Sequence, residues 1–344
     1  MRARPGPRNL ITDVSGIKVG NAADAALQSG VTVVLPDAPT VASVDVRGGA
    51  PGTRETDLLD PAARNDRIDA IVLSGGSAFG LDAAAGLMGW LAERDRGVAV
   101  GGAIVPIVPA AILFDLRDGI ERRWGDTPPY RALARVAADT AADTFTLGNQ
   151  GAGLGAKAGR LKGGLGSASI VDPEGPMGGG ATVGALVAAN PWGSVVMPGS
   201  PCFWAWALEQ DDELGGQPRP DIGAIDLADL SDCAPARVGT NTTLAVVATD
   251  ATLSKADCRR LAMMAQDGLA RAIRPVHTPF DGDCVFALAT ARRGPVDPAT
   301  LVRLGALAAD CVARAIARAV FEAASTPQFV GYRERHGRWL RRPA

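Results

Sequence analysis

An α/β fold is predicted by two features of this sequence. Short apolar runs separated by glycine or proline fill the first third of the chain and are typical of sheet strands. The C-terminal part alternates strand-like apolar runs with segments that have helical apolar periodicity. With 344 residues, 47% of them hydrophobic, the chain can bury a sizeable core as one large domain or as two ordinary ones.

The first part of the chain is expected to supply mainly strands. Each predicted strand is a short apolar run, and the four runs lie at 17–19, 31–35, 41–46 and 70–73. A glycine loop, 74–80, follows the last of them and opens a helix at roughly 80–95. The loop matches neither of the common nucleotide-binding glycine patterns, so its glycines are expected to let the helix pack closely on the sheet.

The middle of the chain is expected to hold a helix near 131–143, a glycine-rich loop from 148 to 167 that enters a strand, and a strand at 181–189. Asn190 follows that strand directly, where a side chain can point into a site. The stretch from 209 to 237 carries eight acidic residues and little apolar periodicity. We predict an exposed linker at about 209–237.

The C-terminal part has the most regular pattern. We expect four elements there, in the order strand, helix, strand, helix: 244–249, 254 to about 273, 284–290, and 298 to about 324. Ser254 begins a capping-box pattern, and Asp297 followed by Pro298 is a typical helix start. These signals fix where both helices should begin.

Composition excludes several classes of function. The formal net charge of −2 disfavours a general nucleic-acid binder. No stretch of about 20 apolar residues and no apolar signal region is present, so we expect neither membrane insertion nor secretion. The five cysteines lack any Cys-x-x-Cys spacing, which fits a reducing compartment and predicts a cytoplasmic protein.

Histidine is scarce, and this restricts the chemistry. Only His277 and His336 are present, and His336 lies in the basic C-terminal tail. A Ser-His-Asp triad and a histidine-based zinc site are therefore disfavoured, and we expect no metal and no cofactor. If the protein is an enzyme, its base is expected to be an amine or a carboxylate.

The stretch 239–243 joins the acidic segment to an apolar run. If the chain cuts itself between Asn241 and Thr242, the freed threonine carries a hydroxyl nucleophile and an α-amine with a pKa of about 7.7–8.0, suited to a general base. The alternative is structural: threonine is favoured in strands, so Thr242 and Thr243 can simply begin one.

Two carboxylates, Asp281 and Asp283, flank a glycine just before the predicted strand at 284–290. Such a pair can hold a hydrogen-bond network around a nucleophile and orient a new N-terminal amine. It can equally form a turn whose side chains bond local backbone N–H groups, and a calcium loop is a weaker third reading. His277 is expected to orient or pack, and not to bind metal.

Taken together, several motifs resemble the DmpA family of self-cleaving hydrolases, which includes L-aminopeptidase/D-esterases, β-aminopeptidases and nylon-oligomer hydrolases. The resemblance covers nearly the whole chain and rests on 10–14, 47–55, 74–81, 162–167 and the threonine junction. It implies a four-layer αββα sandwich of the N-terminal-nucleophile hydrolase type, a single domain over 1–344. It further implies cleavage into fragments 1–241 and 242–344, and a homo-oligomer of processed units, such as a tetramer.

The resemblance also assigns roles to residues. Thr242 matches the nucleophile, Asp281 and Asp283 match the pair that supports it, and Asn190 matches an asparagine that stabilises the oxyanion. Two positions depart from the family pattern: Arg160 stands where the nylon hydrolase has a lysine, and Phe114 replaces a tyrosine. Arginine does not titrate near neutrality, so Arg160 can polarise or orient a group but cannot replace a lysine proton carrier. The Phe114 departure affects the second oxyanion donor and the substrate preference.

The function predicted from the sequence is a self-processing N-terminal-threonine hydrolase that works through an acyl-enzyme on Thr242. Its expected substrates are small peptides, amino-acid amides or ω-amino acid oligomers. Two alternatives stay open: an acyltransferase similar to ornithine acetyltransferase, and a non-enzymatic small-molecule binder.

Overall fold

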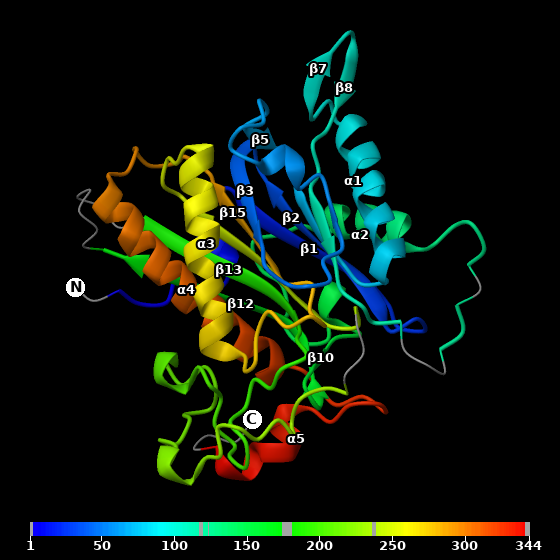
Figure 1. Ribbon diagram of the computed structural model, residues 1–344. Coiled ribbons are helices and arrows are strands. Elements are labelled where there is room, and N and C mark those ends of the chain that lie inside the picture. Colours follow the sequence, from blue (N-terminus) through cyan, green and yellow to red (C-terminus); the bar gives the residue numbers. More distant parts are fainter. Residues whose placement is uncertain (1–2, 117–119, 123, 174–180, 236–238, 341–344) are drawn as a thin grey trace.

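Two stacked sheets with helices on both outer faces form the four layers of the protein (Figure 1). The computed structural model describes residues 3–116, 120–122, 124–173, 181–235 and 239–340. One sheet has the order β1 (Ile17–Asp24), β2 (Ser29–Pro36), β6 (Ile71–Ser74), β9 (Ala110–Ile112) and β4 (Thr53–Arg54). The other has the order β12 (Gly164–Asp172), β13 (Ala181–Asn190), β14 (Thr242–Thr249), β15 (Cys284–Ala289), β3 (Thr40–Val46) and β5 (Arg67–Ile68).

The helices form the outer layers. Helices α1 (Asp82–Ala92) and α2 (Tyr130–Asp139) pack on the five-stranded sheet, and α3 (Lys255–Ala272) and α4 (Pro298–Phe321) pack on the six-stranded sheet. This arrangement confirms the predicted αββα sandwich. A short helix, α5 (Tyr332–His336), follows α4 near the C-terminus. The predicted helix near 131–143 is shorter than expected, and the strand predicted at 244–249 begins two residues earlier, at Thr242.

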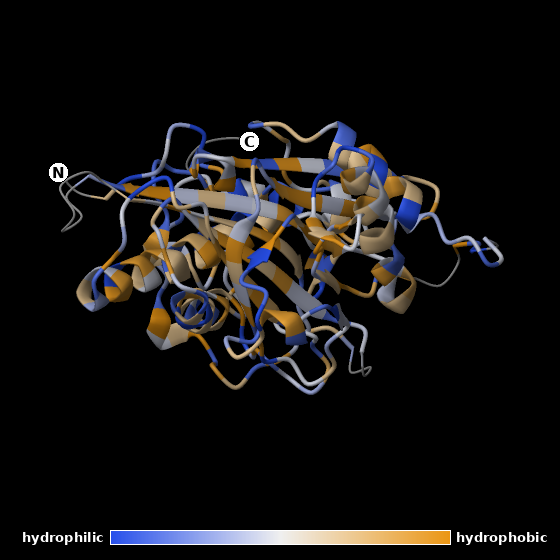
Figure 2. Ribbon diagram, turned by 90° about the horizontal axis from the view of Figure 1, so that it is seen from above, coloured by the Kyte–Doolittle hydropathy of each residue, from blue (hydrophilic) through white to orange (hydrophobic). Residues whose placement is uncertain are grey.

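The core between the sheets explains the continuous apolar run of β14. Leu244, Val246 and Ala248 face the five-stranded sheet, whereas Ala245 and Val247 face the helices. All eight residues of the strand are buried, because a central strand covered on both faces has no solvent side. Figure 2 shows hydrophobic residues along the strands, with hydrophilic residues on the loops and on the helices.

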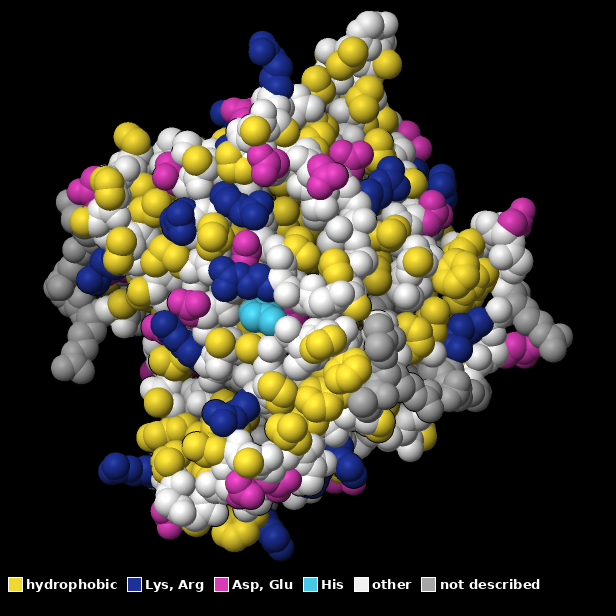
Figure 3. Space-filling model, in the orientation of Figure 1, with side chains coloured by type: hydrophobic (Ala, Val, Ile, Leu, Met, Phe, Trp, Pro, Cys, Tyr) yellow, Lys and Arg dark blue, Asp and Glu magenta, His cyan; other side chains and the backbone are white. Residues whose placement is uncertain are grey.

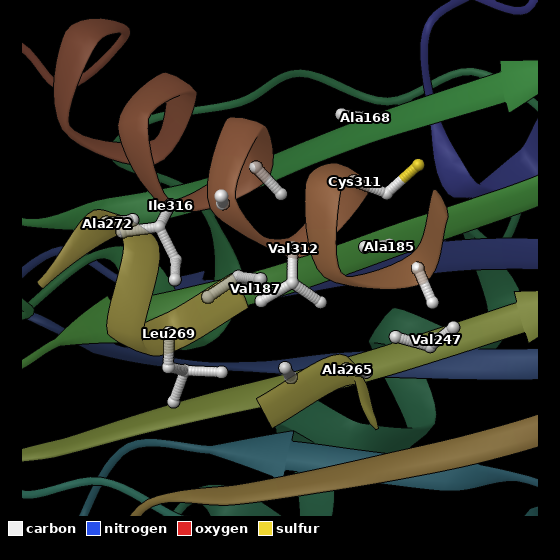
Figure 4. Packing of buried hydrophobic residues seen from close by; sticks show 14 of the residues in the cluster. Ala168, Ala185, Val187, Val247, Ala265, Leu269, Ala272, Cys311, Val312 and Ile316 are labelled. Carbon is white, nitrogen blue, oxygen red and sulfur yellow. The ribbon is translucent and has the colours of Figure 1, made fainter. Parts of the chain in front are cut away.

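Helices α3 and α4 pack on the sheet through small residues (Figure 4). Ala168 and Ala185, which pair across β12 and β13, lie beside Cys311 of α4, and Ile316 lies beside Ala272 of α3. Gly268 brings the two helices together, since a Cβ there would lie 2.3 Å from the carbonyl oxygen of Ala309. Both predicted helix starts are confirmed: Ser254 caps α3 and Asp297 caps α4, each accepting a hydrogen bond from the backbone three residues on.

The predicted role of the glycine loop at 74–80 is also supported. A Cβ at Gly80 would lie 1.9 Å from the carbonyl oxygen of Gly75, and Gly76 has φ +83° and lies against the ring of Tyr130. The loop therefore allows close packing of α1 and α2 on the sheet.

The acidic segment at 209–237 is only partly exposed. Most of 221–232 is exposed, but Leu214 and Gln217 are buried. The physical reason is Arg314 on α4, a fully buried cation that pairs with Glu213 and also donates to the side chain of Asn9 at 2.9 Å. A buried guanidinium needs a carboxylate partner, and Glu213 is therefore buried beside it. The prediction of an exposed linker therefore fails for the first part of the segment.

The surface carries no large field of one sign on the face seen in Figure 3, where basic and acidic side chains are interspersed. A hairpin of β7 (Val98–Val100) and β8 (Ala103–Val105) stands away from the body beside α1 (Figure 1). In the part of the chain that the structure describes, no helix is both long and apolar enough to cross a bilayer.

Candidate active site

Three strand ends meet at one edge of the six-stranded sheet. Strand β13 runs antiparallel to β14, and Asn190 at its end pairs with Thr242 at the start of β14. Strand β15 runs parallel to β14, so the loop that contains Asp281 and Asp283 reaches the same edge. The fold thus brings together all of the residues singled out from the sequence for this site.

The bond between Asn241 and Thr242 is buried at this edge. Asn241 is fully buried and Thr242 is 3% exposed. The Thr242 hydroxyl donates a hydrogen bond to the carbonyl oxygen of Asn241. The same oxygen accepts a hydrogen bond of 3.0 Å from the backbone N–H of Gly282. A hydroxyl and a polarising N–H group therefore lie against the same carbonyl.

Gly282 was not predicted from the sequence as a site residue. A Cβ at this position would lie 2.8 Å from Thr242 Oγ and 2.6 Å from the carbonyl oxygen of Ala50. Only glycine therefore brings this N–H up to the Asn241 carbonyl without moving the Thr242 hydroxyl. The sequence signal for Gly282 is its place between Asp281 and Asp283, but a pattern of residue types assigns no role to its backbone N–H.

Asp283 fixes the start of β14. Its carboxylate accepts a hydrogen bond of 2.7 Å from the backbone N–H of Thr243. The other carboxylate oxygen accepts from the backbone N–H of His277 at 3.2 Å and lies 2.9 Å from His277 Nδ1. His277 therefore orients a carboxylate, as the sequence suggested, and Asp283 in turn holds the residue next to Thr242.

Asp281 holds the chain that follows β13. Its carboxylate accepts a hydrogen bond of 2.9 Å from the backbone N–H of Trp192 and further bonds from the backbone and hydroxyl of Thr278. Burial, and then the nearby charge of Asp283, raise the pKa of Asp281 to about 6. The two carboxylates thus bond residues that flank Asn190 and Thr242.

The segment 47–50, which follows β3, supports the loop that contains Asp281 and Asp283. The backbone N–H groups of Arg47 and Gly48 both donate to the carbonyl oxygen of Asp283, at 3.0 and 3.1 Å. The N–H of Ala50 donates to the carbonyl oxygen of Asp281 at 2.8 Å. These bonds hold the segment 281–283 in place from its solvent side.

Asn190 is fully buried and its amide is held at both ends. Its side-chain oxygen accepts a hydrogen bond of 2.9 Å from the backbone N–H of Lys157. Its Nδ2 donates to the carbonyl oxygens of Phe114, at 3.3 Å, and Thr240, at 3.5 Å. In the uncut chain, the amide group thus bonds the segment just before the Asn241–Thr242 bond.

A cavity of about 660 Å³ adjoins Asn190. The described residues that line it are Phe114, Leu116, Lys157, Gly159, Arg160, Pro235, Thr240, Gln328, Phe329 and Arg335. No sequence pattern marks Lys157 as a site residue, since the family resemblance places Arg160 at the position of the lysine. The structure places both in this lining, with Lys157 buried and Arg160 exposed. The cavity lining therefore includes a lysine as well as two arginines.

The residues that the structure describes show no metal centre. Within the described ranges, no group of three or more His, Cys, Asp or Glu side chains is arranged to hold a metal ion. The five cysteines are buried as free thiols.

The fold is that of known N-terminal-nucleophile-type hydrolases. It matches a Burkholderia sp. β-aminopeptidase with a TM-score of 0.72 and 24% identity, over 97% of this chain and 93% of the other. It matches the L-aminopeptidase D-Ala-esterase/amidase of Ochrobactrum anthropi, described as a variant of the Ntn hydrolase fold, with a TM-score of 0.68 and 24% identity, over 99% and 97% of the two chains.

The sequence comparisons identify the family. The profile of Peptidase family S58 matches residues 9–334, so the chain belongs to this family. An uncharacterized aminopeptidase of Mycobacterium leprae is 48% identical over 93% of this chain and 92% of its own length. A 6-aminohexanoate-oligomer endohydrolase of Kocuria sp. is 29% identical over 83% of this chain and 76% of its own length. The protein is a peptidase or amide hydrolase, and the resemblance seen in the sequence is confirmed.

Proposed function

We propose that the chain cuts itself between Asn241 and Thr242, and that the freed Thr242 then hydrolyses amide bonds in small peptides, amino-acid amides or amino-acid oligomers. The observation that supports this most is the pair of contacts on the Asn241 carbonyl, from the Thr242 hydroxyl and from the Gly282 N–H. One group is a nucleophile, and the other is a donor where negative charge would develop.

Processing begins when Thr242 Oγ attacks the carbonyl carbon of Asn241. The new C–O bond forms first and makes the carbonyl oxygen an oxyanion; the C–N bond then breaks, and the hydroxyl proton passes to the departing amine. The oxyanion formed on the way is stabilised by the Gly282 N–H. Water then cleaves the ester, which leaves a carboxylate on Asn241 and restores the Thr242 hydroxyl beside a free α-amine.

In the processed enzyme, the α-amine of Thr242 takes the proton of its own hydroxyl. An α-amine has a pKa of about 7.7–8.0, so it accepts a proton readily near neutral pH. Asp283 keeps this residue in register by holding the adjacent Thr243 N–H. The hydroxyl attacks the substrate amide, the amine half leaves with a proton, and water hydrolyses the acyl-enzyme.

Cleavage also changes what Asn190 can do. Its Nδ2 donates to the Thr240 carbonyl in the uncut chain. Once the bond after Asn241 is cut, the end of fragment 1–241 can withdraw, and the amide can turn toward a substrate oxyanion. Asn190 then serves the mature reaction, whereas Gly282 serves the processing step.

The substrate class follows from the relatives by analogy. Their names include aminopeptidases and a 6-aminohexanoate-oligomer endohydrolase, so short amides of α- or ω-amino acids are the natural first panel. We also propose that processed units assemble as a homo-oligomer, such as a tetramer. Light scattering of the purified enzyme measures its mass and tests this directly.

Variants of Thr242 test the proposal. Thr242→Ala should remain a single chain and hydrolyse none of the amides, because it lacks the hydroxyl. Thr242→Ser should process and retain activity, since it keeps the hydroxyl and the amine. An active Thr242→Ala protein would contradict the proposal. Faster acyl transfer to an added amine than to water would instead favour an acyltransferase.

A further inference from the structure

Two surfaces of opposite charge lie at the end of the molecule that carries α5. The first, called here the acidic surface, is the largely exposed stretch 221–230 of the acidic segment. The second, the basic surface, consists of Arg335, Arg338 and Trp339, which are exposed in α5 and in the turn that follows it. Figure 1 shows the acidic segment and α5 together at the lower end of the molecule. Both surfaces therefore face solvent at one end of the protein.

Contacts within the chain hold the two surfaces next to each other. Arg335 pairs with Asp232, just after the acidic surface, at a distance of 3.3 Å. A Cβ at Gly215, in the same acidic segment, would lie 3.1 Å from the side chain of Leu340. The C-terminal turn thus lies against the segment that carries the acidic surface, and the two surfaces form one face.

The acidic surface has a fixed negative charge. The sequence holds no lysine or arginine at 220–236. Three aspartates each accept a hydrogen bond from the backbone N–H two residues further on: Asp221, Asp226 and Asp229. The N–H of Ser231 lowers the pKa of Asp229, so this carboxylate stays ionised at neutral pH. The turns therefore determine where the negative charges stand.

Both surfaces also expose large apolar side chains. Ile222, Leu227 and Leu230 of the acidic surface are 52%, 44% and 48% exposed, and Trp339 of the basic surface is 52% exposed. Single exposed apolar residues are ordinary, but a group of them bordered by charges is typical of a contact surface. The guanidinium of Arg338 lies 5.1 Å from the centroid of the Trp339 ring. Each surface thus combines charge with apolar area.

Both surfaces are anchored to the body of the protein. The carbonyl oxygen of Leu227 accepts a hydrogen bond of 3.2 Å from the side chain of Arg274, which follows α3. Tyr332, at the start of α5, is fully buried and stacks on Phe203 with ring centroids 4.3 Å apart. A surface that is fixed before binding loses less conformational entropy on binding, so this face is preorganised for a partner.

A second copy of the chain is the partner that fits both surfaces. A twofold rotation places the acidic surface of one copy on the basic surface of the other, and each contact is then made twice. Opposite charges attract in both contacts, and the apolar side chains between them are removed from water. A foreign basic peptide would cover only the acidic surface and would leave Trp339 exposed.

We propose, on the basis of the homo-oligomer in the proposed function, that this face is a twofold interface in which 221–230 of each copy binds Arg338 and Trp339 of the other. Arg335 keeps its pair with Asp232 within its own chain. The interface joins processed units and takes no part in cutting the chain after Asn241. Assembly and processing can therefore be measured separately.

Charge reversal on each side tests the interface, by light scattering of the purified protein over a range of concentrations. Asp226→Arg and Arg338→Glu should each halve the mass of the wild-type assembly and raise its dissociation constant by about tenfold or more, because like charges then meet in both contacts. An equal mixture of the two variants should recover the wild-type mass, since both contacts of the mixed pair again join opposite charges. A chain that carries both substitutions should recover it too.

Asp60→Arg is the matched control. Asp60 is exposed and also accepts a backbone hydrogen bond from two residues further on, from Ala62 at 2.8 Å. Its turn lies beside Lys255 at the start of α3, whereas the acidic surface lies beside Arg274 at the other end of this helix. Asp60→Arg should leave the mass unchanged, and all of these variants should be cut into two fragments as the wild type is.

The outcomes separate this interface from the rest of the account. A wild type that stays a monomer would overturn the interface and the proposed oligomer, while fragments on a denaturing gel would still support the Thr242 mechanism. An oligomer whose mass neither charge reversal changes would overturn this face alone, and so would a mixture that fails to recover the mass. An oligolysine peptide that binds the wild-type oligomer without lowering its mass, but does not bind Asp226→Arg, would show that the acidic surface is open in the assembly and would refute the interface.

Discussion

Replacing Gly282 by alanine separates the role of this residue in processing from its role in folding. The added Cβ would lie 2.8 Å from Thr242 Oγ, and ordinary contact begins at 3.4 Å, so the two groups must move apart by about 0.6 Å. The backbone carbonyl of Ala50, at 2.6 Å, blocks the other direction. Misplacing a reacting group by 1 Å costs on the order of 100-fold in rate, so processing should slow by about tenfold or more.

Overpacking also lowers stability, typically by about 1–3 kcal/mol, and a matched control is needed. Gly184→Ala supplies it, because its Cβ would lie 2.7 Å from the Cα of Ile11, at a position in β13 away from the cut. We expect both variants to lose similar free energy of unfolding in urea, but only Gly282→Ala to process slowly.

The assay follows newly synthesised protein in a cell-free reaction and measures conversion of the full-length chain to its two fragments on a denaturing gel. Conversion of Gly282→Ala at the wild-type rate would refute the assignment of its N–H to the Asn241 carbonyl. Equal slowing of Gly184→Ala would show that general destabilisation, and not placement of the Thr242 hydroxyl, controls the rate.

Three further predictions concern the polar residues of the site. Asp283→Asn should slow processing or turnover by much more than it lowers the free energy of unfolding, because it weakens the charge-assisted bond to the Thr243 N–H. Equal losses, in time courses of processing and in urea titrations of stability, would favour a purely structural turn. Asn190→Ala should reduce kcat of the processed enzyme by about 100-fold or more while processing continues, and parallel losses in both assays would contradict separate roles. The pKa of Asp281 is raised to about 6 from 3.8, so the folded state binds the carboxyl proton more tightly than the unfolded state does. The stability that this proton contributes is therefore lost as the pH rises from about 4 through 6. In urea titrations, the free energy of unfolding of the wild type, relative to that of Asp281→Asn, should fall on the order of 2–3 kcal/mol over this pH range. A difference between the two proteins that does not change with pH would contradict the raised pKa.

The sequence predicts the strands and helices well because their signals are local. Ser254 and Asp297 mark helix starts through their own capping bonds, and the run after Thr243 marks a buried strand by composition alone. The four-layer arrangement is predicted only by the family resemblance, because local sequence patterns do not specify how two sheets pack on each other.

The parts of the site that the sequence missed depend on contacts between distant segments. Lys157 reaches the cavity only because its neighbouring strands fold back beside β13, and Gly282 meets Asn241 through the pairing of two loops. The burial of Glu213 cannot be predicted from the acidic segment around it, because its ion-pair partner Arg314 is far away in sequence. Such partners are set by tertiary packing and leave no local pattern.

The most direct test of the central claim is the mass of the purified wild-type protein, together with Edman sequencing of its smaller fragment. We predict two fragments, 1–241 and 242–344, and a smaller fragment whose sequence begins Thr242-Thr243-Leu244. An intact 344-residue chain that hydrolyses amides would contradict the account.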